Sequence, residues 1–355
     1  MFKLFVTAAV LFPCIAPLSQ AATLQAQSPS TPIVGMLVDA VRLEGVEDVH
    51  LEGDYAYLPC REGKRLTICS IADPANPQVV SSFTHPSIGG VAGFALHEDI
   101  AYVTSQGTGL LLVIDVKDKA APKLLSSVPV GPPEKGARGT GILYKVAYRD
   151  GYCFVANLSA KKLFVVDVRE PNQPVVVSSV AVTEDNDGPF SVTLHGDYAL
   201  VGTIFGSRNR LAVVDVKDPA APRLITQVFD PDVGHTSGEV IGRYFFSVNW
   251  DKNAFLVFDV FDPANPQLKA KLIDKRLGNP NRCIVSGKRA YLPMVSGNGV
   301  AIVDISEPEN PKFVTAFHDA PMKKTYGVAA RGDLLFVGSR KGNSLVILNR
   351  EALEK

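Results

Sequence analysis

The stretch LAVVDV at Leu211–Val216 decides the fold, because close copies of it recur along the chain. The other copies read LTICSI ending at Ile71, LLLVIDV at Val116, LFVVDV at Val168, FLVFDV at Val260, VAIVDI at Ile305 and LVILN at Asn349. The aspartate position, which is Ser70 in the first copy and Asn349 in the last, recurs every 44 to 52 residues. Such a period is typical of one blade of a β-propeller.

Each repeat contains the same parts in the same order. Around Asp215 these parts are an apolar run 189–194, a turn 195–197, a strand 198–203, the strand 211–216, a Pro-rich turn 218–222 and a last strand 224–229. Val, Ile, Leu, Tyr and Phe dominate runs that are too short for helices. Four antiparallel strands in each of seven repeats predict an all-β protein, a seven-bladed β-propeller.

The two ends of the repeat region predict how the ring closes. The last repeat ends after its third strand, 345–349, whereas PIVGML at Pro32–Leu37 resembles the fourth strands 77–83 and 122–128. We therefore expect the N-terminal strand to pair into the last blade, which removes an exposed sheet edge. The predicted propeller spans residues 32–350, and residues 351–355 are expected to form a short polar tail.

The first residues read as a targeting segment. Lys3 precedes an apolar stretch from Leu4 to Leu18, and small residues lead to a cleavage site after Ala21. Residues 1–21 are thus predicted to be a signal peptide and 22–31 a disordered lead. No other run is long enough to span a bilayer, so we expect export to the periplasm, the cell surface or the medium without a transmembrane segment.

Composition and cysteine usage fit a compact monomeric domain. The 355 residues are 46% hydrophobic and carry 36 basic and 36 acidic side chains, so no net field favours nucleic acid. Cys60 and Cys69 flank one hairpin, but a loop centred near Gly63 places them opposite Leu66 and Tyr57. We expect buried free thiols rather than a disulfide, and the spacing shows no zinc motif.

The repeated core resembles a named family. LLVID, FVVDV, AVVDV and AIVDI, followed by Pro turns such as DPANP at Asp73 and Asp262, are similar to the LVIVD-repeat proteins, which are secreted or cell-surface propellers. The resemblance implies an exported propeller and brings no catalytic residues. The repeated aspartate is interpreted as structural, because it can accept hydrogen bonds from the backbone amides of the following turn.

Candidate binding residues lie where the repeats differ most, in the blade-to-blade connections and in the loops between the second and third strands. Basic side chains in these loops could attract a carboxylate, a phosphate or an acidic glycan, or could form a solvated rim. Charged and aromatic residues where the innermost strands begin could bind a polar ligand. Alternatively, the charged residues could form ion pairs with one another that hold the blades in register. The candidates are Asp48, Tyr144, Lys145, Phe190, Arg208, Arg210, Arg282, Tyr326 and Arg340.

Metal binding is a further possibility on the same face. Carboxylates on successive connections could bind calcium, and connection histidines could hold a transition metal or act as bases. The candidates are His235, His318, Asp185, Asp187 and Asp232. The alternative for each histidine is a hydrogen bond within its own turn, the carboxylates do not follow the EF-hand spacing, and no other cofactor is predicted.

Catalytic motifs are absent from the sequence: it contains no GxSxG, no HExxH and no phosphate-binding loop. We therefore expect a binding or scaffolding module whose partner is a protein or a cell-envelope glycan. The alternative is a metal-assisted hydrolase or lyase of the propeller type, with its site at the channel mouth.

Overall fold

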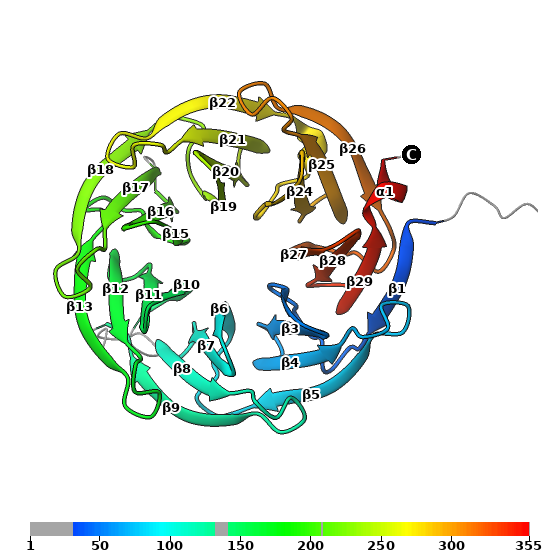
Figure 1. Cartoon of the computed structure of the whole chain (residues 1–355), viewed down its shortest axis with the longest axis horizontal. Coiled ribbons are helices and arrows are strands. Elements are labelled where there is room, and N and C mark those ends of the chain that lie inside the picture. The colour runs from blue at the N-terminus through cyan, green and yellow to red at the C-terminus, as the bar shows by residue number, and fades with distance from the viewer. Residues whose placement is uncertain (1–30, 132–140, 207–208, 355) are drawn as a thin grey trace, which may run out of the picture. The chain divides into compact units, whose positions relative to one another are not determined.

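The computed structural model describes residues 31–131, 141–206 and 209–354. The signal peptide, almost all of the predicted lead and the candidate Arg208 lie outside these residues. The chain divides into two units, Met1–Thr31 and Pro32–Lys355. The second unit is a ring of seven antiparallel sheets, with the first strand of each sheet at the centre and the fourth at the rim (Figure 1).

The blades follow one another along the chain. Blade 1 has β2 (His50–Glu52), β3 (Tyr55–Cys60), β4 (Arg65–Ser70) and β5 (Gln78–Thr84). Blade 2 has β6 (Val91–His97), β7 (Ile100–Ser105), β8 (Leu110–Asp115) and β9 (Lys123–Pro129). Blade 3 has β10 (Leu143–Arg149), β11 (Tyr152–Asn157), β12 (Lys162–Asp167) and β13 (Val175–Ala181). Blade 4 has β14 (Gly188–Pro189), β15 (Thr193–His195), β16 (Tyr198–Ile204), β17 (Arg210–Asp215) and β18 (Arg223–Phe229).

The remaining blades complete the ring. Blade 5 has β19 (Ser237–Ile241), β20 (Tyr244–Asn249), β21 (Ala254–Asp259) and β22 (Gln267–Ile273), followed by a 3₁₀ turn, η1 (Lys275–Leu277). Blade 6 has β23 (Ile284–Ser286), β24 (Arg289–Met294), β25 (Gly299–Asp304) and β26 (Lys312–His318). Blade 7 has β27 (Thr325–Arg331), β28 (Leu334–Ser339), β29 (Ser344–Asn349) and β1 (Ile33–Val38). The predicted all-β, seven-bladed propeller is confirmed.

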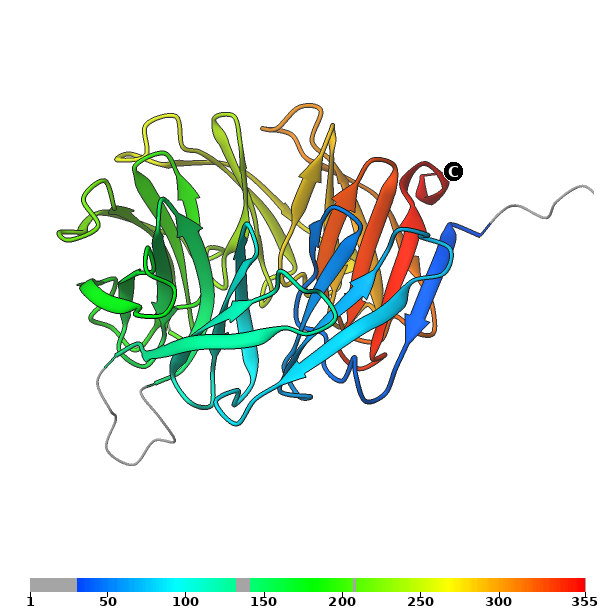
Figure 2. The same cartoon turned by 60° about the horizontal axis from the view of Figure 1, so that its bottom comes forward.

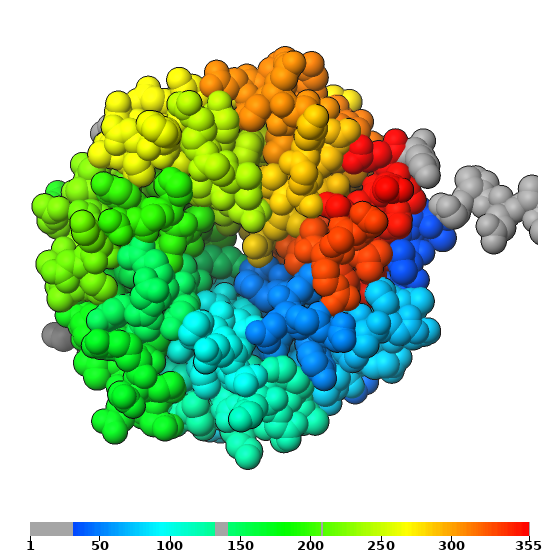
Figure 3. Space-filling model, in the orientation of Figure 1, coloured from blue at the N-terminus to red at the C-terminus, as the bar shows by residue number. Residues whose placement is uncertain are grey.

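The core lies between neighbouring blades. The second and third strands are buried on both faces, as in β21, because each sheet packs between two others. One apolar cluster joins Phe246 and Val257 of blade 5 to Leu292 and Val303 of blade 6. The fourth strands at the rim are mostly exposed or half-buried, and in β22 the two classes alternate strictly. Figure 3 shows a recess near the centre of the ring, where the first strands meet.

β1 closes the ring as predicted. It pairs antiparallel with β29, and the backbone N–H of Asn349 donates to the Pro32 carbonyl at 2.7 Å. Figures 1 and 2 show β1 and β29 side by side, although they lie at opposite ends of the repeat region. Gly35 is buried against blade 1, where a Cβ atom would lie only 2.1 Å from the Pro74 carbonyl oxygen. Only glycine fits such a close approach.

The repeated aspartates have the predicted structural role. Asp215 Oδ1 accepts a hydrogen bond from the Lys217 N–H at 3.0 Å, and Asp115 and Asp304 make the same contact two residues on. In the last repeat, Asn349 Oδ1 instead accepts from the Ala352 N–H and caps α1 (Arg350–Leu353). The residues expected to form a polar tail thus begin a helical turn, which buries Leu353.

The cysteines are free and buried, but the hairpin register differs from the prediction by one residue. Cys60 lies opposite Arg65, and Cys69 lies opposite Ala56. The reason is that Arg61–Lys64 forms the turn, with Lys64 at a φ of 50°. Burial raises the pKa of Cys60 and of Cys69 to about 12, so both thiols stay protonated at neutral pH.

Candidate functional site at the channel mouth

The candidate site lies on the face that carries the loops between second and third strands. Because the second and fourth strands of a blade run in the same direction, these loops and the blade-to-blade connections emerge together. At the centre of this face the loops and the first residues of the innermost strands enclose a cavity of about 690 Å³. That volume is typical of a small-molecule site. We refer to it below as the mouth cavity.

An arc of rings forms one side of the mouth cavity. Tyr144 and Phe190 pack edge to face with ring centres 4.9 Å apart, and Phe190 contacts His235 at 4.6 Å. His235 stacks on Trp250 at 5.0 Å, and Trp250 meets the edge of Tyr326 at 5.7 Å. These five residues come from blades 3, 4, 5 and 7, so the arc exists only when the ring is closed. Because Tyr144, Phe190 and Tyr326 are themselves buried, the arc offers a ligand the edges of rings that are held firmly in place.

A polar arc completes the circle. The Arg340 guanidinium lies over the Tyr326 ring at 4.8 Å and pairs with Glu62 at 2.6 Å and Glu47 at 3.4 Å. Arg61 lies 3.7 Å from Glu47 and donates to Gln106. Burial raises the pKa of the Tyr144 hydroxyl, and Arg61 and Gln106 oppose this shift from beside it. Arg61 therefore connects the polar arc to the aromatic one.

Two buried polar side chains of the mouth cavity have spare hydrogen-bonding capacity. Glu47 is 4% exposed, and its Oε2 atom lies 3.4 Å from Arg340 as an ion pair but makes no hydrogen bond to a described residue. Asn281 is 2% exposed and lines the same cavity, and its amide makes no hydrogen bond within the described ranges. Burial raises the pKa of Glu47, although Arg340 and Arg61 oppose the shift.

His235 presents a neutral imidazole to the mouth cavity. Burial lowers its pKa to about 4, although Asp251 opposes the shift. Its ring nitrogens make no hydrogen bond to a described residue, while its backbone N–H donates to the Thr203 carbonyl at 2.9 Å. The residue has a φ of 50°, and Phe205, which also lines the cavity, has a φ of 67°. Left-handed backbone is unusual for such bulky residues and is often found at functional sites.

The predicted residues Asp48, Lys145 and Arg282 form an ion cluster one residue further along the innermost strands. Lys145 Nζ lies 2.9 Å from Asp48 Oδ2, and Arg282 donates to Asp48 Oδ1. Burial lowers the pKa of Lys145, and it lowers that of Arg282 to about 10. His50 Nε2 lies 3.3 Å from Asp48, and burial lowers the His50 pKa to about 3. The cluster joins blades 1, 3 and 6 across the channel.

The other candidates are not brought together. Arg210, at the start of β17, is buried and pairs with Asp187 at 3.0 Å and with Asp185. Asp232 pairs with Lys271 at 2.9 Å, and His318 Nδ1 lies 2.6 Å from the Gly297 carbonyl oxygen. Within residues 31–131, 141–206 and 209–354, no three or more His, Cys, Asp or Glu side chains form a group able to hold a metal. Of the five predicted ligands, Asp185 and Asp187 thus share Arg210, and the other three lie in separate contacts.

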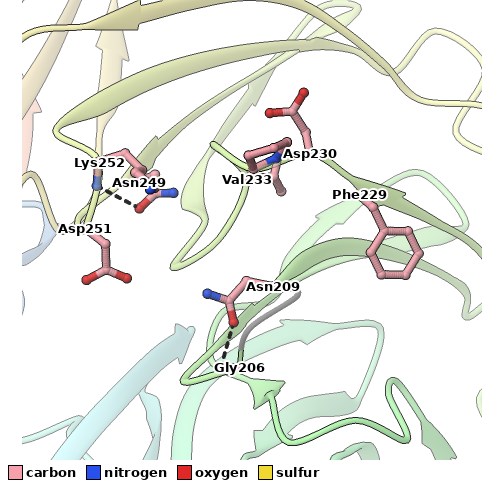
Figure 4. Close-up of a pocket in the computed structure, with 9 residues that line it drawn as sticks. Gly206, Asn209, Phe229, Asp230, Val233, Asn249, Asp251 and Lys252 are labelled. Carbon is pink, nitrogen blue, oxygen red and sulfur yellow. Dashed lines mark hydrogen bonds between the residues drawn. The ribbon is translucent and has the colours of Figure 1, made fainter.

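A second cavity of about 530 Å³ adjoins the mouth cavity and lies between blades 4 and 5. The two cavities share Gly206, Asn209 and Asp251. Figure 4 shows Asn209 and Phe229 of blade 4 around an open space, with Asn249, Asp251 and Lys252 of blade 5 across it. The Asp251 carboxylate has no hydrogen bond or ion pair with a described residue. We call this second cavity the blade 4/5 cleft.

Sequence reasoning found part of the site. Tyr144, Phe190, Tyr326 and Arg340 line the mouth cavity, as does His235, which was expected to bind metal. Glu47, Asn281 and Arg61 also line it and were expected near the mouth from the alignment of the repeats, whereas Trp250 was not singled out. Trp250 carries a usable signal, because it is the one tryptophan in the sequence and follows directly after a second strand.

Comparisons with known proteins agree with the repeat pattern. A family model described as the LVIVD repeat matches residues 45–85, 88–130, 141–182, 190–230 and 278–319. No curated protein sequence matches the chain. No helix among the described residues is long and apolar enough to cross a membrane.

Solved structures share the fold at low identity. Virginiamycin B lyase from Staphylococcus aureus is 8% identical, with a TM-score of 0.67 over 88% of this chain and 98% of the lyase. The Cps50 (Swd1) propeller domain from Myceliophteria thermophila is 14% identical, with a TM-score of 0.67 over 89% of this chain and 98% of that domain. A putative 6-phosphogluconolactonase from Bacteroides fragilis is 13% identical, with a TM-score of 0.64 over 90% of this chain and 92% of the lactonase chain. These similarities concern the fold alone.

Proposed function

This chain belongs to the LVIVD-repeat family, and from that premise we propose that it is an exported binding propeller whose ligand occupies the mouth cavity. One observation carries the proposal. Glu47 and Asn281 are buried in the wall of a large cavity, yet retain hydrogen-bonding capacity that no described residue uses. A ligand that hydrogen-bonds to them would use the acceptor position of Glu47 Oε2 and the amide of Asn281, which make no hydrogen bond within the described ranges.

The arrangement of the mouth cavity also supports binding. Its wall is held by blades that pack against one another around the whole ring, so little ordering is needed when a ligand enters. Trp250 and Tyr326 provide large surfaces, and Arg61 and Arg340 provide donors at fixed positions. Export is part of the proposal and is supported by the signal-like sequence of residues 1–21.

The experiment uses a chain that begins at Ala22 and a mixed panel of saccharides, short peptides and organic acids. Binding is read from thermal melting and from the fluorescence of Trp250, which reports on the cavity directly. We expect at least one compound class to raise the melting temperature and change the Trp250 emission. Asn281→Ala should weaken that binding about tenfold, because a hydrogen bond to the ligand is lost.

The matched control is Asn265→Ala. Asn265 lies in the Pro-rich turn before β22, on the face opposite the mouth cavity, and bonds only to Gln267 and within its own turn. This variant should bind like the parent protein. The proposal fails if no compound moves either signal, or if Asn281→Ala and Asn265→Ala bind every hit equally well.

A further inference from the structure

The charges around the mouth cavity are balanced. Two acidic residues, Glu47 and Asp251, and two basic residues, Arg61 and Arg340, line it. A cationic ligand would meet both guanidinium groups, and an anionic one would displace their pairing with the buried Glu47 carboxylate. Removing one partner from a buried charge pair is costly. The cavity therefore favours a neutral ligand that both donates and accepts hydrogen bonds.

The polar arc and the aromatic arc lie on different sides of the mouth cavity, so a ligand that fills it needs both a polar edge and an apolar face. The Glu47 carboxylate accepts hydrogen bonds, and Asn281 both donates and accepts them. The other side of the cavity is aromatic. The ring centre of Phe190 lies 4.6 Å from that of His235, and the ring centre of Trp250 lies 5.7 Å from that of Tyr326. A neutral molecule that meets both arcs has hydroxyl groups at its edge and an apolar face of C–H groups. A pyranose sugar has this character.

The blade 4/5 cleft shows where a longer ligand would continue. It meets the mouth cavity at Asn209 and Asp251, so the two form one path from the channel mouth outward. The cleft also places an aromatic residue opposite a polar one: Phe229, which is 43% exposed and whose ring lies 4.6 Å from the Arg210 guanidinium, faces the carboxylate of Asp251 across it (Figure 4). Two adjoining cavities of about 690 and 530 Å³ exceed what one sugar requires.

We infer that the site binds the end of a neutral glycan chain, with the terminal sugar in the mouth cavity and the following sugars in the blade 4/5 cleft. The terminal sugar stacks on Trp250 and donates a hydroxyl hydrogen bond to Glu47, while Asn281 bonds to a second hydroxyl or an acetamido group. This inference rests on the proposed function, because it names the ligand class of the same site.

The test measures binding of two neutral series by calorimetry: β-1,4-linked glucose and β-1,4-linked N-acetylglucosamine, each from one to six units. Affinity for at least one series should rise with length and then level off once the cleft is filled. Glu47→Gln should weaken every binding length about tenfold, because the acceptor loses its charge. Phe229→Ala should weaken the longer chains several-fold and leave the single sugar unchanged. Glu351→Gln on α1 is the control and should change nothing.

The remaining outcomes show whether the neutral-glycan inference fails alone or together with the proposed function. If the neutral sugars do not bind, while an oligogalacturonate or a peptide changes the Trp250 emission, the neutral glycan is wrong and the binding site remains. If affinity does not depend on length and Phe229→Ala has no effect, the path through the cleft is overturned. If no compound binds, both proposals fail. Where Glu47→Gln does not fold, Asn281→Ala takes its place, since Asn281 makes no hydrogen bond among the described residues.

Discussion

The imidazole of His235 lies between Phe190 and Trp250, and its position shows how single residues acquire their properties from the ring. A histidine in a solvated loop has a pKa near 6.5. Here burial lowers the pKa to about 4, so the ring is neutral at physiological pH and acts as part of the aromatic arc. The left-handed backbone at this residue holds the ring in place.

We predict that Trp250 fluorescence reports the protonation of His235. Emission should stay constant from pH 8 to pH 6 and fall as the pH passes through about 4, because a charged imidazole stacked 5.0 Å from the indole quenches it. His235→Asn should remove this step, and asparagine tolerates the left-handed backbone better than most residues. A step near pH 6.5 would show that the ring is solvated and would contradict the stacked geometry.

The sequence could predict some residues of the mouth cavity and not others, for a physical reason. Aligning the repeats brings Tyr144, Phe190 and Tyr326 to one level, because equivalent positions of a propeller point to the same part of the channel. The pairing of Asp185 and Asp187 with Arg210 cannot be seen in this way, since it depends on how the irregular connection before β14 folds against the start of β17. Those carboxylates were expected to bind calcium and instead neutralise a buried guanidinium.

At the scale of elements, β1 is held both by its ladder with β29 and by the tight contact of Gly35 with blade 1. We predict that Gly35→Ala destabilises the protein by about 1–3 kcal/mol, because the added methyl group must displace the Pro74 backbone. The free energy of unfolding is measured by denaturant titration. Met36→Ala is the control, as Met36 is 45% exposed on the same strand, and should change stability by less. Equal effects would contradict the close approach.

The strands were predictable and the turns were not. The buried third strands appear in the sequence as runs such as LAVVD, whose pattern survives in every repeat. The turn between β3 and β4 shifted the expected register by one residue, because a Gly-containing loop does not reveal how many of its residues are paired. Similarly, the residues after β29 looked polar, yet Asn349 caps a helical turn that Leu353 anchors.

For the whole molecule, acid should be destabilising from about pH 6.5 downward. His50 and His235 have folded pKa values of about 3 and 4, so the unfolded chain takes up protons first as the pH falls below 6.5. Below pH 4 the turn aspartates add to the loss, since hydrogen bonds from Lys217 and Ser306 lower the pKa values of Asp215 and Asp304. Protonation of Glu47 opposes this loss of stability. Burial raises its pKa in the folded protein, so the folded state takes up that proton before the unfolded chain does.

The measurement is the melting temperature from pH 9 to pH 3. It should be nearly constant above pH 7, decline between pH 6.5 and 4, and decline further below pH 4. In His235→Asn the melting temperature should fall less between pH 6.5 and 4 than in the parent protein. The remaining fall is the part that His50 causes. A melting temperature that stays constant down to pH 4 would show that neither histidine is buried as a neutral ring.

The pairing of β1 with β29 has a consequence for the order in which the molecule is made. β1 emerges from the ribosome before the other strands, whereas its partner strand, β29, belongs to the last of the seven repeats. The six complete blades can assemble while the chain is growing, whereas β1 must wait unpaired until the final blade emerges. The ring therefore closes only once β29 is available to β1, and only then do Tyr326 and Arg340 of blade 7 take their places beside Glu47 of blade 1. A truncated nascent chain would hold most of its blades and no complete binding site.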